Sequence, residues 1–71
     1  MNPRERLRAY VDGHVTIKER RFVLESLEED HQVLRDEDQM HTFIWFTSIK
    51  DVAEGQGAPP EIIMNPRVTP D

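Results

Sequence analysis

The chain has 71 residues, no cysteine, and a formal net charge of −5 from 14 acidic and 9 basic side chains. A chain of this length forms one small domain with a thin core, and without cysteine it has neither disulfides nor thiolate metal ligands to supplement that core. The acidic balance argues against nucleic acid as a partner, because such binding depends mainly on Lys and Arg contacts to phosphate; a basic protein partner is more plausible. No apolar run has the length of a membrane span or secretion signal, so we expect a soluble, cytoplasmic chain with no membrane contact.

The first segment predicts a short helix over residues 3–11. Asn2 is a suitable N-cap, and Pro3 suits the first helical position because it lacks an N–H. Three apolar side chains recur at the i, i+3, i+4 spacing of one helix face: Leu7, Tyr10 and Val11.

The Asp12-Gly13 pair that follows has two interpretations. Flanked by apolar and β-branched residues, it is a strong signal for a β-hairpin with a type I′ turn. A glycine there also ends a helix well, and Thr16 with Glu19 forms a capping box that would start another. We interpret Gly13 as the joint between two helices, over residues 3–11 and 16–34. The hairpin stays open as the alternative.

In the second helix, Val23, Leu24, Leu27 and Leu34 share one face, with Phe22 in a narrower strip roughly opposite. The third segment, residues 36–52, can start with a capping box of Asp36 and Gln39. Its centre, HTFIWFTSI, favours a strand by propensity. As a helix it is apolar on two sides, with Met40, Phe43 and Ile44 on one and Trp45, Phe46, Ile49 and Val52 on the other.

Residues 54–71 contain the helix-breaking run GQGAPP and predict an extended or disordered tail. The triplet Ile62-Ile63-Met64 can fold back onto the domain or add to a partner as a strand. The predicted fold is therefore mainly α: a three-helix interaction domain over residues 1–53 and a flexible tail over 54–71. The alternative is a small α+β domain with a hairpin at Asp12-Gly13.

No catalytic or metal-binding constellation is recognisable. His14, His31 and His41 match no metal-ligand spacing, and the acidic runs ESLEED and RDEDQ indicate solvated surface. There is no phosphate-binding loop or nucleophile elbow. We expect no enzyme activity, cofactor or metal.

The apolar residues exceed what three helices can bury, and an exposed apolar patch usually marks an interaction surface, with Trp a favoured anchor. The tail or a homodimer could equally cover this surface. We expect the partner-binding residues to be Leu7, Tyr10, Val11, Phe22, Trp45, Phe46, Ile49 and Val52.

The stretch LRAYVDGHVTIKERRFVLESL resembles the N-terminal signature of anti-sigma factors, especially the zinc-binding anti-sigma family. The matching positions are Tyr10, Val11, Asp12, Gly13, Thr16, Glu19, Arg20, Val23 and Leu27. Ser26, Asp30 and Val33 stand at about the positions of that family's His-x3-Cys-x2-Cys ligands, so the resemblance implies a relative without zinc. It implies a helical, non-enzymatic transcription regulator that binds and sequesters a sigma factor, either as a soluble protein or as the cytoplasmic part of a membrane-anchored one. The alternatives are a small acidic adaptor or antirepressor, and a structural homodimer or small subunit of a complex.

Overall fold

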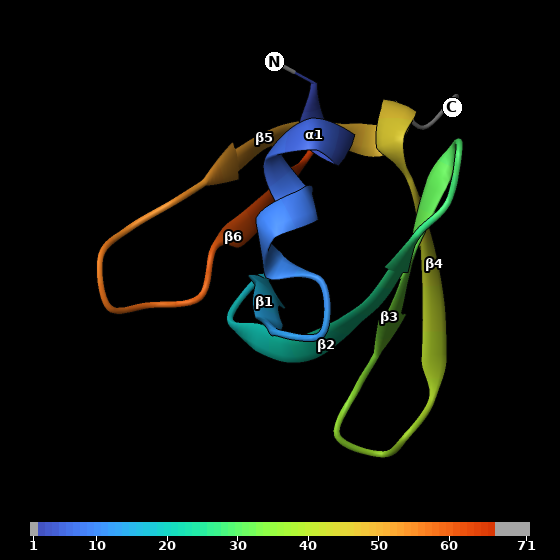
Figure 1. The fold of residues 1–71 in the computed structure, drawn as a ribbon, viewed down its shortest axis with the longest axis vertical. Helices are drawn as coiled ribbons and strands as arrows, with labels where there is room; N and C mark the ends of the chain where they lie inside the picture. Colours follow the sequence, from blue (N-terminus) through green and yellow to red (C-terminus); the bar gives the residue numbers. More distant parts are fainter. Residues whose placement is uncertain (1, 67–71) are drawn as a thin grey trace.

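The computed structural model describes residues 2–66, which form a short helix followed by a six-stranded mixed sheet (Figure 1). The helical elements are α1 (Pro3–Leu7) and the 3-10 turns η1 (Arg8–Tyr10) and η2 (Phe46–Ser48). The strands are β1 (His14–Ile17), β2 (Arg20–Leu27), β3 (His31–Arg35), β4 (His41–Trp45), β5 (Ile49–Ala53) and β6 (Glu61–Met64).

The sheet has the strand order β4-β3-β2-β1-β6-β5. Strands β1 to β4 form an antiparallel meander, and β5 and β6 form a second antiparallel pair. The two parts meet where β1 runs parallel to β6, with Thr16 opposite Glu61 and the Thr16 N–H donating to the Pro60 carbonyl at 2.9 Å. The outer edges of the sheet are therefore β4 and β5.

The mainly helical prediction, including the helical character expected of the interaction domain, is wrong. Residues 16–34 form no helix, because they contain the second half of β1, all of β2 and most of β3. In β2, Phe22 and Leu24 alternate into the core, but the register with β3 then shifts between Leu24 and Ser26. This β-bulge moves the next core-packed side chain to Leu27, so the spacing from Leu24 imitates one helical turn.

Asp12-Gly13 is neither a hairpin turn nor a joint between two helices. The chain leaves η1, turns through Asp12 at φ 69° and enters β1 at His14. Gly13 lies so close to Tyr10 that an added Cβ would be 3.2 Å from the Tyr10 carbonyl oxygen. The predicted first helix is present as α1 followed directly by the 3-10 turn η1, and at its start the Asn2 side chain accepts a hydrogen bond from the Glu5 N–H at 2.9 Å.

The true hairpin turn between β1 and β2 is Lys18-Glu19, with φ of 48° and 69°. Two consecutive left-handed residues are the signature of a type I′ turn, which glycine and asparagine normally occupy. Lys18 and Glu19 are not of these residue types, so the sequence does not predict the turn.

The core lies between the sheet and α1, and every strand except β4 contributes a buried apolar residue to it. Its members are Leu7, Val15, Phe22, Leu24, Leu34, Ile49, Val52 and Ile62.

Part of the segment expected to be an extended or disordered tail belongs to the folded sheet, because Ile62 of β6 is buried against Val52 of β5. Residues 67–71 of that tail lie outside the described residues. Within residues 2–66, no helix has the length and apolar character needed to cross a membrane.

Candidate functional site

Within the part of the chain that the structure describes, the outer edge of β4 presents unpaired backbone groups. At one end of the β3–β4 ladder the Asp36 N–H donates to the Met40 carbonyl at 3.0 Å, and at the other the Phe46 N–H donates to the Asp30 carbonyl at 3.0 Å. Hydrogen-bonded pairs alternate with non-hydrogen-bonded pairs along an antiparallel ladder. The backbone N–H and C=O groups of three β4 residues therefore point away from β3: His41, Phe43 and Trp45.

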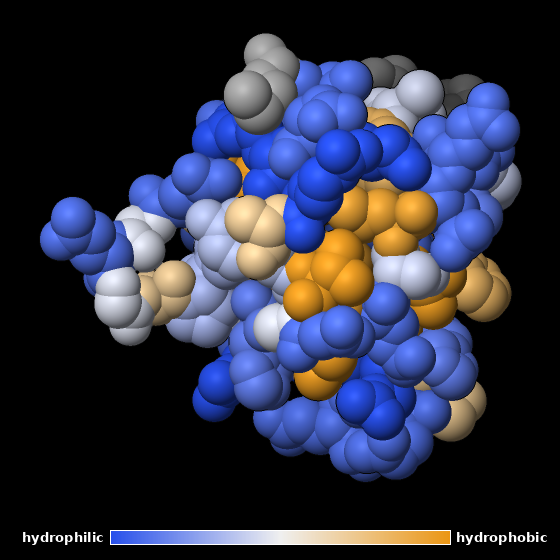
Figure 2. All heavy atoms as spheres, viewed as in Figure 1, coloured by the Kyte–Doolittle hydropathy of each residue, from blue (hydrophilic) through white to orange (hydrophobic). Residues whose placement is uncertain are grey.

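The same three residues carry the exposed side chains of β4. Phe43 is 61% exposed and Trp45 54%, and Met40, just before the strand, is 64% exposed. The ring of His31 on β3 lies edge-on to both aromatic side chains, with ring centroids 5.8 Å from Phe43 and 5.5 Å from Trp45. Figure 2 shows hydrophobic atoms reaching the surface in the middle of its view and along the margin where Figure 1 draws β4.

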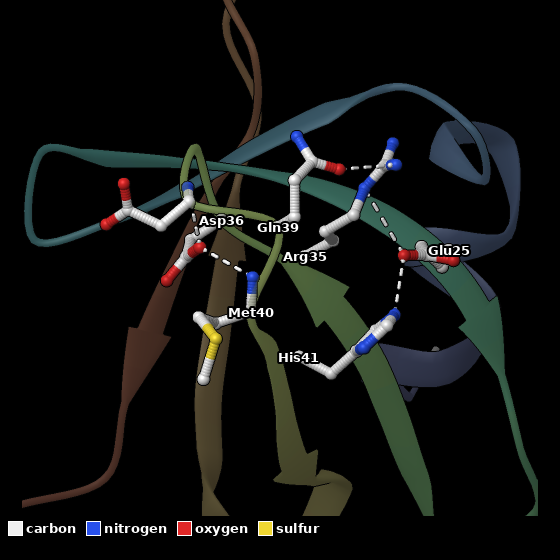
Figure 3. A network of polar contacts seen from close by, with 7 residues as sticks. Glu25, Arg35, Asp36, Gln39, Met40 and His41 are labelled. Atoms are coloured by element: carbon white, nitrogen blue, oxygen red, sulfur yellow. Dashed lines mark hydrogen bonds and ion pairs between the residues drawn. The ribbon is translucent and has the colours of Figure 1, made fainter.

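A polar network holds the amino end of β4 in place (Figure 3). The Glu25 carboxylate of β2 lies 3.3 Å from the Arg35 guanidinium of β3 and 2.9 Å from the His41 ring nitrogen of β4. In the turn that leads into β4, the Asp36 carboxylate accepts hydrogen bonds from the backbone N–H groups of Asp38 and Met40, at 2.9 and 3.0 Å. These contacts tie β4 to the meander and hold its outer edge in place.

The opposite edge of the sheet, β5, is blocked by side chains. At Val52, in the middle of the strand, the backbone N–H donates to the Asp51 carboxylate at 2.8 Å and the carbonyl accepts from the Arg6 guanidinium of α1. Arg6 also pairs with Asp51 at 2.5 Å. The Val52 N–H and the Arg6 guanidinium together hold the pKa of the Asp51 carboxyl below its ordinary value. Both outward groups of Val52 are thus occupied, which is a common protection of edge strands against pairing.

A groove of about 970 Å³ lies between β4 and β6. Ile44 and Trp45 line it from β4, Ile62 and Met64 line it from β6, and Lys18 lies at the hairpin turn of β1 and β2.

The eight residues predicted to bind a partner do not form one exposed surface in the structure. Leu7, Phe22, Ile49 and Val52 are buried in the core, while Tyr10 and Phe46 are partly buried and pack against it. Only Val11 and Trp45 are well exposed.

No family model matches this chain. Neither a curated protein nor a solved structure shows significant similarity to it. Among residues 2–66, no group of three or more histidine, aspartate or glutamate side chains is placed to hold a metal ion.

The predicted partner-binding residues do not include three members of this site: His31, Met40 and Phe43. The signal that identifies them is the alternation in residues 41–45, where His41, Phe43 and Trp45 face one way while Thr42 and Ile44 face the other. This period of two is the mark of a half-buried strand.

Proposed function

We propose that this protein is a small, non-enzymatic interaction module that binds an extended segment of another protein along β4. In this mode, known as β-strand addition, main-chain hydrogen bonds supply affinity and alternate side-chain contacts supply specificity. The observation that carries the proposal is the difference between the two edges of the sheet: β4 offers the backbone groups of His41, Phe43 and Trp45, whereas those of Val52 on β5 are occupied.

Two further features support this proposal. An exposed edge strand is normally protected by charged side chains or proline, yet the outward residues of β4 are two aromatic residues and a histidine. Aromatic side chains are the residues most often found at the energetic centre of protein interfaces. Sigma factor as the partner stays a prediction, and the helices on which that resemblance depended are largely absent.

The experiment begins with selection of binding peptides from a random library against the full chain. Each selected peptide is then made with backbone N-methyl groups at every second residue, in both possible phases. In strand addition, one phase methylates the amides that face β4 and abolishes binding, while the other phase is tolerated. Equal binding by both methylated forms would overturn the proposal.

A matched pair of variants tests the location. Phe43→Lys places a charge on the β4 edge, and we expect it to weaken binding at least about ten-fold. Val11→Lys makes the same change at an exposed apolar residue before β1, and we expect it to leave binding unchanged. Binding lost equally in both variants, with the fold intact by circular dichroism, would place the site elsewhere.

A further inference from the structure

Acidic turns stand at both ends of β4 (Figure 1). The β2–β3 turn, with Glu28, Glu29 and Asp30, adjoins the carboxyl end of β4, because His31 pairs with Trp45 and the Phe46 N–H donates to the Asp30 carbonyl. The β3–β4 turn, with Asp36, Glu37 and Asp38, leads directly into its amino end. The exposed edge is therefore an aromatic strand, without lysine, arginine or acidic side chains, between two acidic clusters.

Most of these carboxylates lack a cationic partner. Within residues 2–66, Glu28, Glu29, Glu37 and Asp38 take part in no ion pair, and all four are exposed. Asp36 has Arg20 at 3.8 Å and Asp30 has the His31 ring at 2.7 Å. Arg4 lies beside the β2–β3 turn, but its guanidinium donates to the backbone carbonyl of Glu28 and leaves that carboxylate unpaired.

We propose that the segment bound along β4 is basic at both ends, with about five uncharged residues between the basic groups. This inference rests on the proposed function and names the chemistry of the partner. The spacing follows from β4, whose five residues span about 17 Å at ~3.4 Å per residue. A Lys or Arg beyond each end of that length reaches one acidic turn, and opposite charges across an interface favour the correct partner and register.

The same charges disfavour a second copy of this chain as the occupant. In an antiparallel pair of β4 strands, the 36–38 turn of each copy would lie beside the 28–30 turn of the other. A parallel pair would place each acidic turn beside its own equivalent. Both arrangements oppose like charges at both ends, between chains that each carry a net charge of −5.

The test uses three synthetic peptides built on a run of alternating Thr and Val. The first has two Lys or Arg at each end, the second has two Glu at each end, and the third has its basic residues in the centre. Binding is followed through the fluorescence of Trp45, the only tryptophan. We expect the first peptide to bind at least about ten-fold more tightly than the others, with affinity falling as salt rises.

Charge reversals locate the effect. Glu29→Lys and Asp38→Lys, in the two turns, should each weaken binding of the first peptide several-fold. The control Glu54→Lys, in the exposed segment after β5, should not. Equal affinity for the basic-ended and acidic-ended peptides would overturn the charge proposal and leave strand addition standing. Failure of every peptide, selected or synthetic, would overturn the proposed function as well.

Two other occupants have distinct outcomes. A tight self-dimer in sedimentation equilibrium, dissociated by Phe43→Lys and unaffected by Val11→Lys, would overturn the proposal in favour of a second copy. A chain shortened to end at residue 66 should bind the first peptide with unchanged affinity. If it binds ten-fold more tightly, the chain's own C-terminal residues compete for the edge and are the natural occupant, which again overturns the proposal.

Discussion

Gln32 offers the sharpest test of the core. This β3 residue is fully buried, and neither its side-chain nitrogen nor its side-chain oxygen has a hydrogen-bond partner among residues 2–66. Its neighbours across the sheet are Leu27 on β2 and Ile44 on β4, both apolar. A buried polar group without a partner, here the side-chain amide, costs about 1–3 kcal/mol of folding free energy, whereas an apolar group of the same shape costs nothing of this kind.

We therefore expect Gln32→Met, which nearly conserves volume, to raise the free energy of unfolding by about 1–3 kcal/mol. For a domain of this size the melting temperature rises by about 4–8 °C for each kcal/mol. The measurement is thermal and urea unfolding followed by circular dichroism.

Leu34→Met is the matched control, because Leu34 is equally buried on the same strand and face. A volume-conserving apolar exchange of this kind usually costs less than about 1.5 kcal/mol. If Gln32→Met is neutral or destabilising while Leu34→Met behaves as expected, the amide has a partner such as an internal water, and the reasoning from an unsatisfied group is refuted.

Three further predictions concern the hairpin turn and the blocked edge. Glu19→Gly relieves a left-handed residue and should stabilise the fold by about 1 kcal/mol in urea unfolding; no gain would mean that the turn is unstrained. Because the pKa of Asp51 lies below its ordinary 3.8 in the folded chain, its contribution to stability is present above that value and is lost as pH falls through the folded pKa. Asp51→Asn should therefore reduce the fall of the melting temperature as pH decreases in the acid range. An unchanged fall would contradict the ion pair. Arg6→Met uncovers the Val52 carbonyl and should cause concentration-dependent self-association in light scattering, whereas Arg8→Met, at an exposed neighbour, should not.

Local signals in the sequence predicted local structure well. The Asn2 cap and the Pro3 start of a helix are both present in α1. The aromatic and β-branched residues around Phe43 favoured a strand by propensity, and the structure has one there. In both places a few neighbouring residues determine the conformation.

The predicted helices were wrong where a residue spacing typical of a helix also occurs in bulged strands and hairpin turns. Leu24 and Leu27 are one helical turn apart, but they belong to a strand with a bulge between them. Thr16 and Glu19 match a capping box, yet Thr16 lies in β1 and Glu19 in a type I′ turn made of residues that rarely adopt it. Such a turn forms because pairing of β1 with β2 stabilises it. The residue types in the turn give no indication of that pairing.

The candidate site was only partly predictable for a related reason. Trp45 was expected at a partner surface because Trp is a favoured interface anchor, and it is exposed on β4, whereas Ile49 and Val52 follow a 3-10 turn and lie in the core. Whether a strand lies at the edge of a sheet depends on the whole topology. The unpaired backbone of Phe43 and the occupied backbone of Val52 therefore appear only in three dimensions.

The difference between the β4 and β5 edges also limits how many segments one chain can bind. A sheet with two available edges can add subunits at both and grow into a ring or a filament. With Val52 occupied by Arg6 and Asp51, strand addition is obstructed at β5, and β4 remains as the edge where it can occur. Under the proposed function we therefore expect one bound segment per chain, so that the protein ends an extended sheet and does not continue it.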